Sequence, residues 1–254
     1  MFPARSPLDR RSFLHSAAFG LTTAASFGGG ALAADEAVAA GKNVLIRPEK
    51  QSNRIVSRVV AEQDGATFAM LPSGEIVIDQ SGTVTPTQEV YRASSVDDLA
   101  AELTDSVFPG FKTAKSKRYL FVYNCSEGFR KLTSGILESM FTPLQNYFKR
   151  ERFEVVDPEH PLVVVIFETH QEMREYREIP ESVVAFYEPL SNRVVLSERS
   201  RMVEVAPELG VPQAFATIAH EGVHQILHNI GVQHRLCRWP AWISEGLPEY
   251  FAPC

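Results

Sequence analysis

The segment from Gln213 to Ile230 limits the possible folds more than any other part of the chain. Its apolar residues recur at helical spacing, which predicts an amphipathic helix buried against a core and closed by Gly231. The apolar set is Ala216, Ala219, Val223, Ile226, Leu227 and Ile230. Three ionisable residues, His220, Glu221 and His224, lie within the same segment. Because ionisable side chains are rarely buried without a partner, they need a specific role.

Residues 220–224 read His-Glu-Gly-Val-His, which is the spacing HExxH. Positions i and i+4 of a helix lie on one face, so two imidazoles there can bind one Zn²⁺ at about 2.0–2.1 Å. Glu221 follows the first histidine and is placed to accept a proton from a metal-bound water. His228 continues the row, but at about 1.5 Å per residue it lies about 12 Å along the axis from His220. We therefore expect His228 on the helix surface or behind the ligands. The alternative interpretation of the motif is a helix whose histidines are simply exposed to solvent. The apolar residues around them argue against this alternative.

A catalytic zinc site needs a third protein ligand and one open position. The metzincin extension of the motif would place Gly at 227 and His at 230, but the chain has Leu227 and Ile230. Glu245 follows His224 by 21 positions, in a segment whose two tryptophans and Ile243 would press it against the core. Glu245 is the preferred third ligand. The alternatives are His234, Cys237 and Glu249.

An HExxH motif followed about twenty residues later by Trp-x-x-Glu-Gly resembles the gluzincin clan of zinc metallopeptidases. More narrowly, the chain is similar to a family of exported bacterial proteins described only as a domain of unknown function. The resemblance covers roughly residues 118–252, and its pattern-level parts are Tyr119–Tyr123, the long helix after it, Val163–Phe167, Phe186-Tyr187 and Asn192-Arg193-Val194. It implies an α+β fold, with a zincin-like domain that has a mixed sheet and an HExxH active-site helix.

The resemblance also implies an activity, that of an exported zinc-dependent peptidase acting on a peptide or protein substrate. His220 and His224 match the zinc-binding histidines, Glu221 matches the general base, and Glu245 matches the carboxylate ligand. Glu249 lies one turn beyond Glu245, where the clan often has an acid that supports a metal-bound histidine through its free ring nitrogen. The alternative for Glu249 is a plain exposed glutamate. A further donor must stabilise the oxyanion. Candidates are His234, Arg235, Arg238, Tyr187 and Tyr250.

Two departures from the family pattern favour an alternative function. Pro248 falls inside the second helix, where a proline removes a backbone donor and displaces Glu249 and Tyr250. The chain also ends at Cys254, whereas relatives commonly continue, which implies a domain that is short at its C-terminus. The alternative is a zinc-containing, non-catalytic binding or scaffold protein of the cell envelope. Metal buffering is disfavoured because no His-rich tract is present.

The first 33 residues resemble a twin-arginine export signal. Arg10-Arg11 precede a mildly apolar stretch that ends in Ala31-Leu32-Ala33, a small-x-small cleavage pattern. A membrane anchor is the alternative, but Gly28-Gly29-Gly30 makes a poor spanning helix. We therefore expect a periplasmic or extracellular protein with no membrane span after signal removal. The net charge of -6 and the absence of a basic block argue against a nucleic-acid partner, and the oligomeric state is open.

The remaining chain divides into a flexible lead-in at 34–53, a small β-rich region at 54–116 and the zincin-like domain at 117–254. The region at 54–116 is expected to form an antiparallel sheet followed by a short helix at 95–105 that begins at Ser95. The region at 117–254 has a helix at 126–150, a strand at 162–167 buried on both faces, and a hairpin at 183–196 whose exposed edge offers a place for strand addition. The expected buried face of the long helix is Phe129, Leu132, Ile136, Met140 and Leu144. Three cysteines permit one disulfide, and Cys125–Cys237 is one possible pair.

Overall fold

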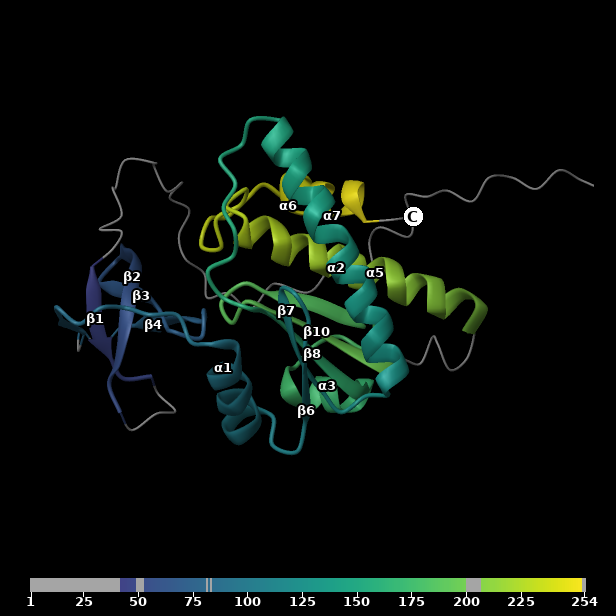
Figure 1. The fold of residues 1–254 in the computed structure, drawn as a ribbon, viewed down its shortest axis with the longest axis horizontal. Coiled ribbons are helices and arrows are strands. Elements are labelled where there is room, and N and C mark those ends of the chain that lie inside the picture. The colour runs from purple at the N-terminus through teal and green to yellow at the C-terminus, as the bar shows by residue number, and fades with distance from the viewer. Residues whose placement is uncertain (1–41, 49–52, 81, 83, 200–206, 253–254) are drawn as a thin grey trace, which may run out of the picture.

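The computed structural model describes residues 42–48, 53–80, 82, 84–199 and 207–252. Within these ranges the fold is α+β, with two five-stranded sheets that lie apart from one another (Figure 1). The expected signal segment at 1–33, most of the expected lead-in and Cys254 lie outside the described residues. None of the helices in these ranges is both long and apolar enough to cross a membrane.

The small sheet is antiparallel throughout, as the sequence predicts. Its order is β4-β3-β2-β1-β5, with β1 (Asn43–Ile46), β2 (Ile55–Gln63), β3 (Ala66–Met70), β4 (Ile76–Asp79) and β5 (Thr85–Pro86). Its core includes Val44, Val59 and Ala69. The expectation of a flexible lead-in is wrong for Asn43–Ile46, because Val44 and Ile46 alternate into this core and β1 pairs with both β2 and β5.

The large sheet is mixed, in the order β6-β7-β8-β10-β9. Its strands are β6 (Lys112–Lys115), β7 (Tyr119–Tyr123), β8 (Leu162–Thr169), β9 (Ala185–Glu188) and β10 (Arg193–Arg199). The three inner strands are parallel, and both edge strands are antiparallel to their neighbours. Residues 162–167 are buried on both faces of the central strand, as expected. β6 belongs to this sheet although it precedes residue 117, where we expected the second region to begin. It was not predicted because its short polar sequence gives little strand signal.

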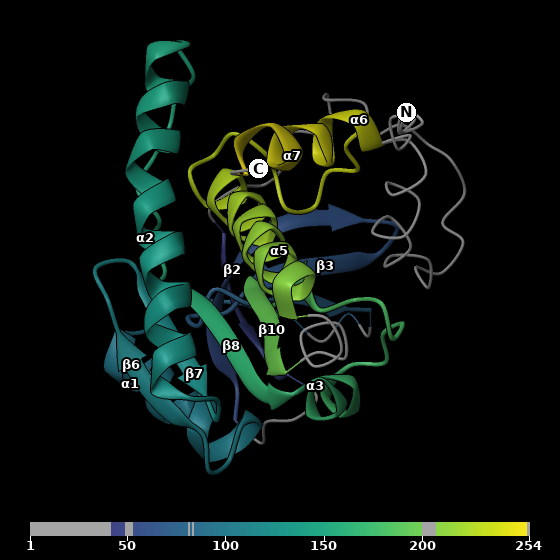
Figure 2. The ribbon, with the colours of Figure 1, turned by 90° about the vertical axis from the view of Figure 1, so that its right-hand side faces the viewer.

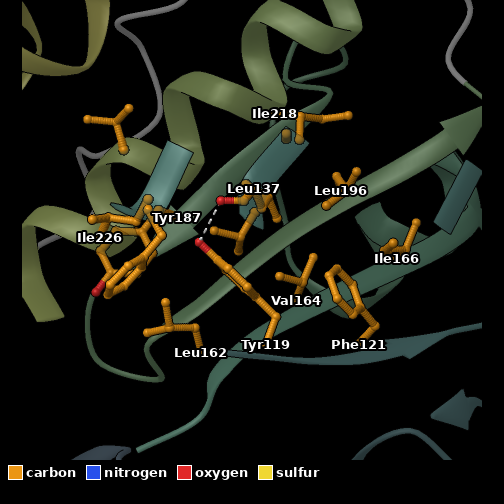
Figure 3. Packing of buried hydrophobic residues seen from close by; sticks show 14 of the residues in the cluster. Tyr119, Phe121, Leu137, Leu162, Val164, Ile166, Tyr187, Leu196, Ile218 and Ile226 are labelled. Atoms are coloured by element: carbon orange, nitrogen blue, oxygen red, sulfur yellow. Dashed lines mark hydrogen bonds between the residues drawn. The ribbon is translucent and has the colours of Figure 1, made fainter. Parts of the chain in front are cut away.

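Helices cover both faces of the large sheet (Figures 1 and 2). They are α1 (Val96–Glu102) with a π-helical turn (Leu103–Val107), α2 (Glu127–Arg150), α3 (His170–Tyr176) and α5 (Pro207–Asn229). On β7, Tyr119 and Phe121 face α2 and α5, whereas Leu120 and Val122 face α1 and α3. Figure 3 shows part of the hydrophobic cluster between the sheet and the helices α2 and α5, in which the Tyr119 hydroxyl donates to the Leu137 carbonyl at 3.4 Å.

The long helix α2 begins after Ser126, whose hydroxyl accepts the Phe129 N–H as an N-cap. Of its expected buried face, Leu144 is buried, and Phe129, Ile136 and Met140 are partly buried and pack against the core. Leu132 is exposed, and the residues buried on α2 are Thr133, Leu137, Phe141, Leu144, Gln145 and Phe148. The most deeply buried stripe is therefore shifted by about one residue, and it includes polar Gln145, whose Nε2 donates to Asp157 Oδ1 at 2.8 Å.

The possible Cys125–Cys237 disulfide is not formed, and both thiols are free. Cys125 is buried just before α2, whereas Cys237 is exposed in the segment that follows α5.

Candidate metal centre

The HExxH residues lie in the second half of α5, on its border between core and solvent. Ala219 and Val223 are fully buried against the sheet and α2. The side chains of His220 and His224 retain 21% and 13% exposure. Their ring centroids are 5.0 Å apart, so one helix turn brings both imidazoles to the same patch.

Gly222, the third residue of the motif, permits close contact between α5 and α2. A Cβ at this position would overlap the Cδ2 of Leu137, a fully buried residue of α2. The glycine has ordinary helical backbone, so its value here is the missing side chain rather than conformational freedom. The two helices can approach closely where the motif faces the core.

We expect Gly222→Ala to destabilise the fold by about 1–2 kcal/mol. Alanine is the better helix former by up to about 1 kcal/mol, but overpacking a buried contact costs about 1–3 kcal/mol. Gly135→Ala on α2 is the matched control, because nothing lies within 4 Å of a Cβ there. Denaturant unfolding of both variants is the measurement. Stabilisation by Gly222→Ala equal to that by Gly135→Ala would show that the contact does not restrict position 222.

Glu245 reaches the histidines from a separate segment. It lies between α6 (Ala241–Ser244) and α7 (Gly246–Phe251), two short helices beside α5 (Figure 2). Pro248 falls in the first turn of α7, and its ring excludes a helical contact with the Ser244 carbonyl four residues earlier. The helix therefore breaks at Glu245, one turn before the proline. Glu249 stays one turn beyond Glu245, since its N–H donates to the Glu245 carbonyl at 3.0 Å.

Three side chains meet at this break. The Oε2 of Glu245 lies 3.3 Å from His220 Nε2 and 3.6 Å from His224 Nε2. The three ligand atoms lie within 4.8 Å of one another. Ligands at about 2.0–2.1 Å from a tetrahedral ion are about 3.4 Å apart, so this spacing suits one small cation. Of the alternatives for the third ligand, His234 and Cys237 are absent from the cluster that the structure forms among its described residues.

The charges of the cluster favour a positive charge between the rings. Hydrogen bonds with His220 and His224 hold the pKa of Glu245 far below its usual range. Burial lowers the pKa of His220, but its hydrogen bond to Glu245 and the nearby Glu221 and Glu249 outweigh burial and raise it. A proton satisfies this preference, and so does a divalent cation bound to deprotonated imidazoles.

Glu221 is held beside the cluster by the edge strand of the large sheet. Its Oε2 accepts the backbone N–H of Tyr187 on β9 at 2.8 Å. Burial raises the pKa of Glu221, and the neighbouring His224 and His220 partly offset this rise. A carboxylate with a raised pKa and a fixed orientation suits proton transfer near neutral pH.

Tyr187 contacts the site through its N–H and its ring rather than through its hydroxyl. The buried hydroxyl donates to Asn192 Oδ1 at 2.9 Å. The ring stacks on His224 and His228, with centroids 6.4 and 5.4 Å away. Burial lowers the pKa of His228 to about 3, so its ring is neutral. His228 is not among the ligand atoms that group together in the described residues, in agreement with the expectation that it does not join the ligands.

Of the other candidate site residues named from the sequence, only Glu249 contacts a histidine ligand in the described structure. The Oε2 of Glu249 lies 3.7 Å from His220 Nδ1, which is the ring nitrogen that faces away from Glu245. Arg235 donates to three backbone carbonyls elsewhere. His234, Arg238 and Tyr250 are exposed; His234 Nδ1 accepts the Leu236 N–H, and the Tyr250 ring contacts Phe251. No contact recorded for Arg235, His234, Arg238 or Tyr250 reaches the two histidine ligands or Glu245.

Sequence analysis missed a polar network behind α5. Asn192, in the β9–β10 turn at φ 59°, exchanges side-chain hydrogen bonds with Asn229 at 2.9 and 2.7 Å. Gln225 donates to the Asn192 carbonyl at 2.8 Å and to the Val163 carbonyl at 3.0 Å. These bonds fix the turn, and hence Tyr187, relative to Glu221. The turn signal around Asn192 was visible in the sequence, but its partners on α5 were not.

A family model described as a protein of unknown function (DUF1570) matches residues 214–254. The matched stretch contains the HExxH residues, Glu245 and Glu249, and excludes both sheets. No curated protein and no solved structure matches the chain.

Proposed function

We propose that the chain is an exported zinc-dependent metallopeptidase of gluzincin type. The observation that carries the proposal is the meeting of two imidazoles from α5 with a carboxylate from a separate segment, all within 4.8 Å. Two nitrogens and one oxygen form a ligand set typical of catalytic zinc, whereas Mg²⁺ and Ca²⁺ prefer oxygen ligands. Three protein ligands leave the fourth position for water or substrate.

Zinc bound there would supply a Lewis acid and lower the pKa of its water to about 7. His220, His224 and Glu245 hold the ion in this proposal, and Glu249 orients the His220 ring. Glu221 accepts the proton of the attacking water and passes it to the leaving amine. Because its Oε2 accepts the Tyr187 N–H, we assign the proton transfer to Oε1.

The substrate class follows from the edge strand. β9 pairs with β10 on one side and is the edge of the sheet on the other. It also carries the N–H that holds Glu221. An extended peptide added along this edge would lie beside the general base, so peptide or protein segments suit the site.

The alternative is a non-catalytic zinc protein, which Pro248 favoured because it was expected to displace Glu249 and Tyr250. The position of Glu249, with Oε2 3.7 Å from His220 Nδ1, supports the peptidase instead. A general base held by a dedicated N–H has no purpose in a purely structural zinc site. Export rests on the sequence of residues 1–33 alone.

Metal removal tests the proposal. We expect the purified protein to hold about one zinc per chain and to hydrolyse an unstructured protein such as casein. A chelator should abolish hydrolysis, and added zinc should restore it. Zinc without hydrolysis would favour the binding or scaffold protein, and a chain that binds no zinc would refute the metal centre.

A further inference from the structure

Arg235 links three parts of the chain that are distant in sequence. It lies in the connector, which we define as residues 231–240 between α5 and α6. Its Nε donates to the Pro189 carbonyl at 2.6 Å, its Nη2 to the Leu190 carbonyl at 2.7 Å and its Nη1 to the Gly74 carbonyl at 2.8 Å. Three acceptors on one planar guanidinium define its position closely, which an ammonium group does not match.

The carbonyls come from two turns that also contact each other. Gly74 lies between β3 and β4 of the small sheet, and Leu190 lies between β9 and β10 of the large sheet. The Ile76 N–H donates to the Leu190 carbonyl at 2.7 Å, and Arg193 pairs with Glu75 at 3.2 Å. The small-sheet turn is therefore bonded both to the connector and to the turn that follows β9.

The small-sheet turn is seated tightly. Gly74 has φ 84°, and a Cβ there would lie 2.9 Å from His160 Cγ. His160 Nε2 lies 2.7 Å from the hydroxyl of Tyr91, a residue that follows the small sheet. A side chain at position 74 would strain the backbone and clash with His160, which should shift the turn whose carbonyl Arg235 contacts.

The connector is also held at its start, where Val232 packs against the core, Gln233 is buried, and both N–H groups donate to the Leu227 carbonyl at 3.1 Å. Beyond Gln233 the bonds of Arg235 are the main ties to the rest of the described structure. The remaining hydrogen bonds recorded for residues 234–239 stay within that stretch, such as Cys237 N–H to the His234 carbonyl at 3.2 Å and Trp239 Nε1–H to the same carbonyl at 3.3 Å. At its far end, the α6–α7 segment is anchored by Phe251 against Tyr147 and Phe148 of α2, with centroids 5.0 and 5.6 Å apart. Arg235 is therefore the main upstream anchor, beyond Gln233, of the segment that carries Glu245.

We propose that Arg235 is a positioning residue of the metal centre and that the small sheet, through its β3–β4 turn, is a structural part of that centre. Arg235 orients the connector that leads to Glu245. It also holds the turn after β9, which carries the Tyr187 N–H bonded to Glu221. One guanidinium thus positions the third ligand and the general base. The zinc part of this inference rests on the proposed function, whereas the ordering of the connector does not.

Zinc affinity, measured by competition with a chelator, is the first test. We expect Arg235→Gln to weaken zinc binding by roughly tenfold or more, as loss of a group that orients a ligand does. Arg58→Gln is the matched control, because Arg58 of β2 pairs with Glu159 across the same interface but touches neither the connector nor the β9–β10 turn. The control should retain its zinc affinity. The zinc affinity of Arg235→Lys, which keeps the charge without the planar guanidinium, should lie between those of Arg235→Gln and the control.

Order in the metal-free protein is the second test. The chain has two tryptophans, Trp239 in the connector and Trp242 in α6. Arg235→Gln should increase acrylamide quenching of their fluorescence and speed hydrogen exchange across residues 232–245, while α2 keeps its protection. This measurement decides the positioning role even if the wild-type chain binds no zinc. Unchanged connector exchange in Arg235→Gln, or wild-type zinc affinity, would overturn the proposal.

A double-mutant cycle tests the route through the small sheet. Gly74→Ala should loosen the connector in the same direction as Arg235→Gln, because it displaces the carbonyl that Arg235 contacts. The connector of the double variant should then exchange no faster than that of Arg235→Gln alone, since both changes disrupt the same contact between Arg235 and Gly74. Additive effects would show that the two residues act separately and would refute the role of the small sheet.

Discussion

Replacing Glu221 with Gln is expected to lower kcat/KM by about 10²–10⁴-fold while zinc content stays at the wild-type level. The amide cannot accept the proton of the attacking water. Its carbonyl oxygen can still accept the Tyr187 N–H, so the strand and the helix should keep their arrangement. Burial already disfavours the charged form of Glu221, and a neutral amide should therefore leave thermal stability equal or higher.

Glu208→Gln is the matched control for that experiment, because Glu208 is an exposed acid at the start of the same helix. It should change neither hydrolysis nor zinc content. Casein hydrolysis, zinc content and melting temperature of both variants give the comparison. Full activity in Glu221→Gln would remove Glu221 from the role of general base.

The second large effect is expected from Glu245→Gln. This change removes the only carboxylate among the three grouped ligand atoms, so zinc affinity should fall by more than about 100-fold, which is more than loss of an orienting partner costs. Hydrolysis should disappear at limiting zinc and return in part at high zinc. Chelator competition measures the affinity directly.

Glu249→Gln is the comparison that separates the two acids. Glu249 lies 3.7 Å from His220 Nδ1 and is proposed only to orient that ring, so the loss of affinity should be roughly tenfold. A larger loss for Glu249→Gln than for Glu245→Gln would reverse their roles. His234→Ala and Cys237→Ser should leave zinc affinity unchanged, because neither side chain joins the grouped ligands.

Features with local causes could be predicted from the sequence. The N-cap at Ser95, the long helix from about residue 126 and the apolar run of β8 depend on neighbouring residues, and the structure confirms them. The prediction of the α2 face was wrong for Leu132, which is exposed, and it missed the buried Gln145, whose hydrogen bond goes to a residue of a later loop. The strand at Asn43–Ile46 was missed for a similar reason, since a four-residue strand is stabilised by its partners rather than by its own pattern.

In the candidate site too, residue types could be predicted from the sequence, but their contacts could not. Sequence analysis assigned the hydroxyl of Tyr187 and the charge of Arg235 as possible oxyanion donors. In the structure, the hydroxyl is bonded to Asn192 and the guanidinium to three carbonyls. What Tyr187 offers the site is a backbone N–H, a group that every residue except proline carries and that therefore leaves no signal in a sequence.

The sequence by itself determined that His220, Glu221 and His224 share one region of a buried helix, because helical period and apolar pattern are local properties of a few consecutive residues. It also selected Glu245 from its surroundings. Only the tertiary structure decided that Glu245 lies 3.3 Å from His220, since that distance depends on how the connector is anchored. The anchor includes a bond from Arg235 to Gly74, 161 residues away, and sequence spacing carries no information about such a contact.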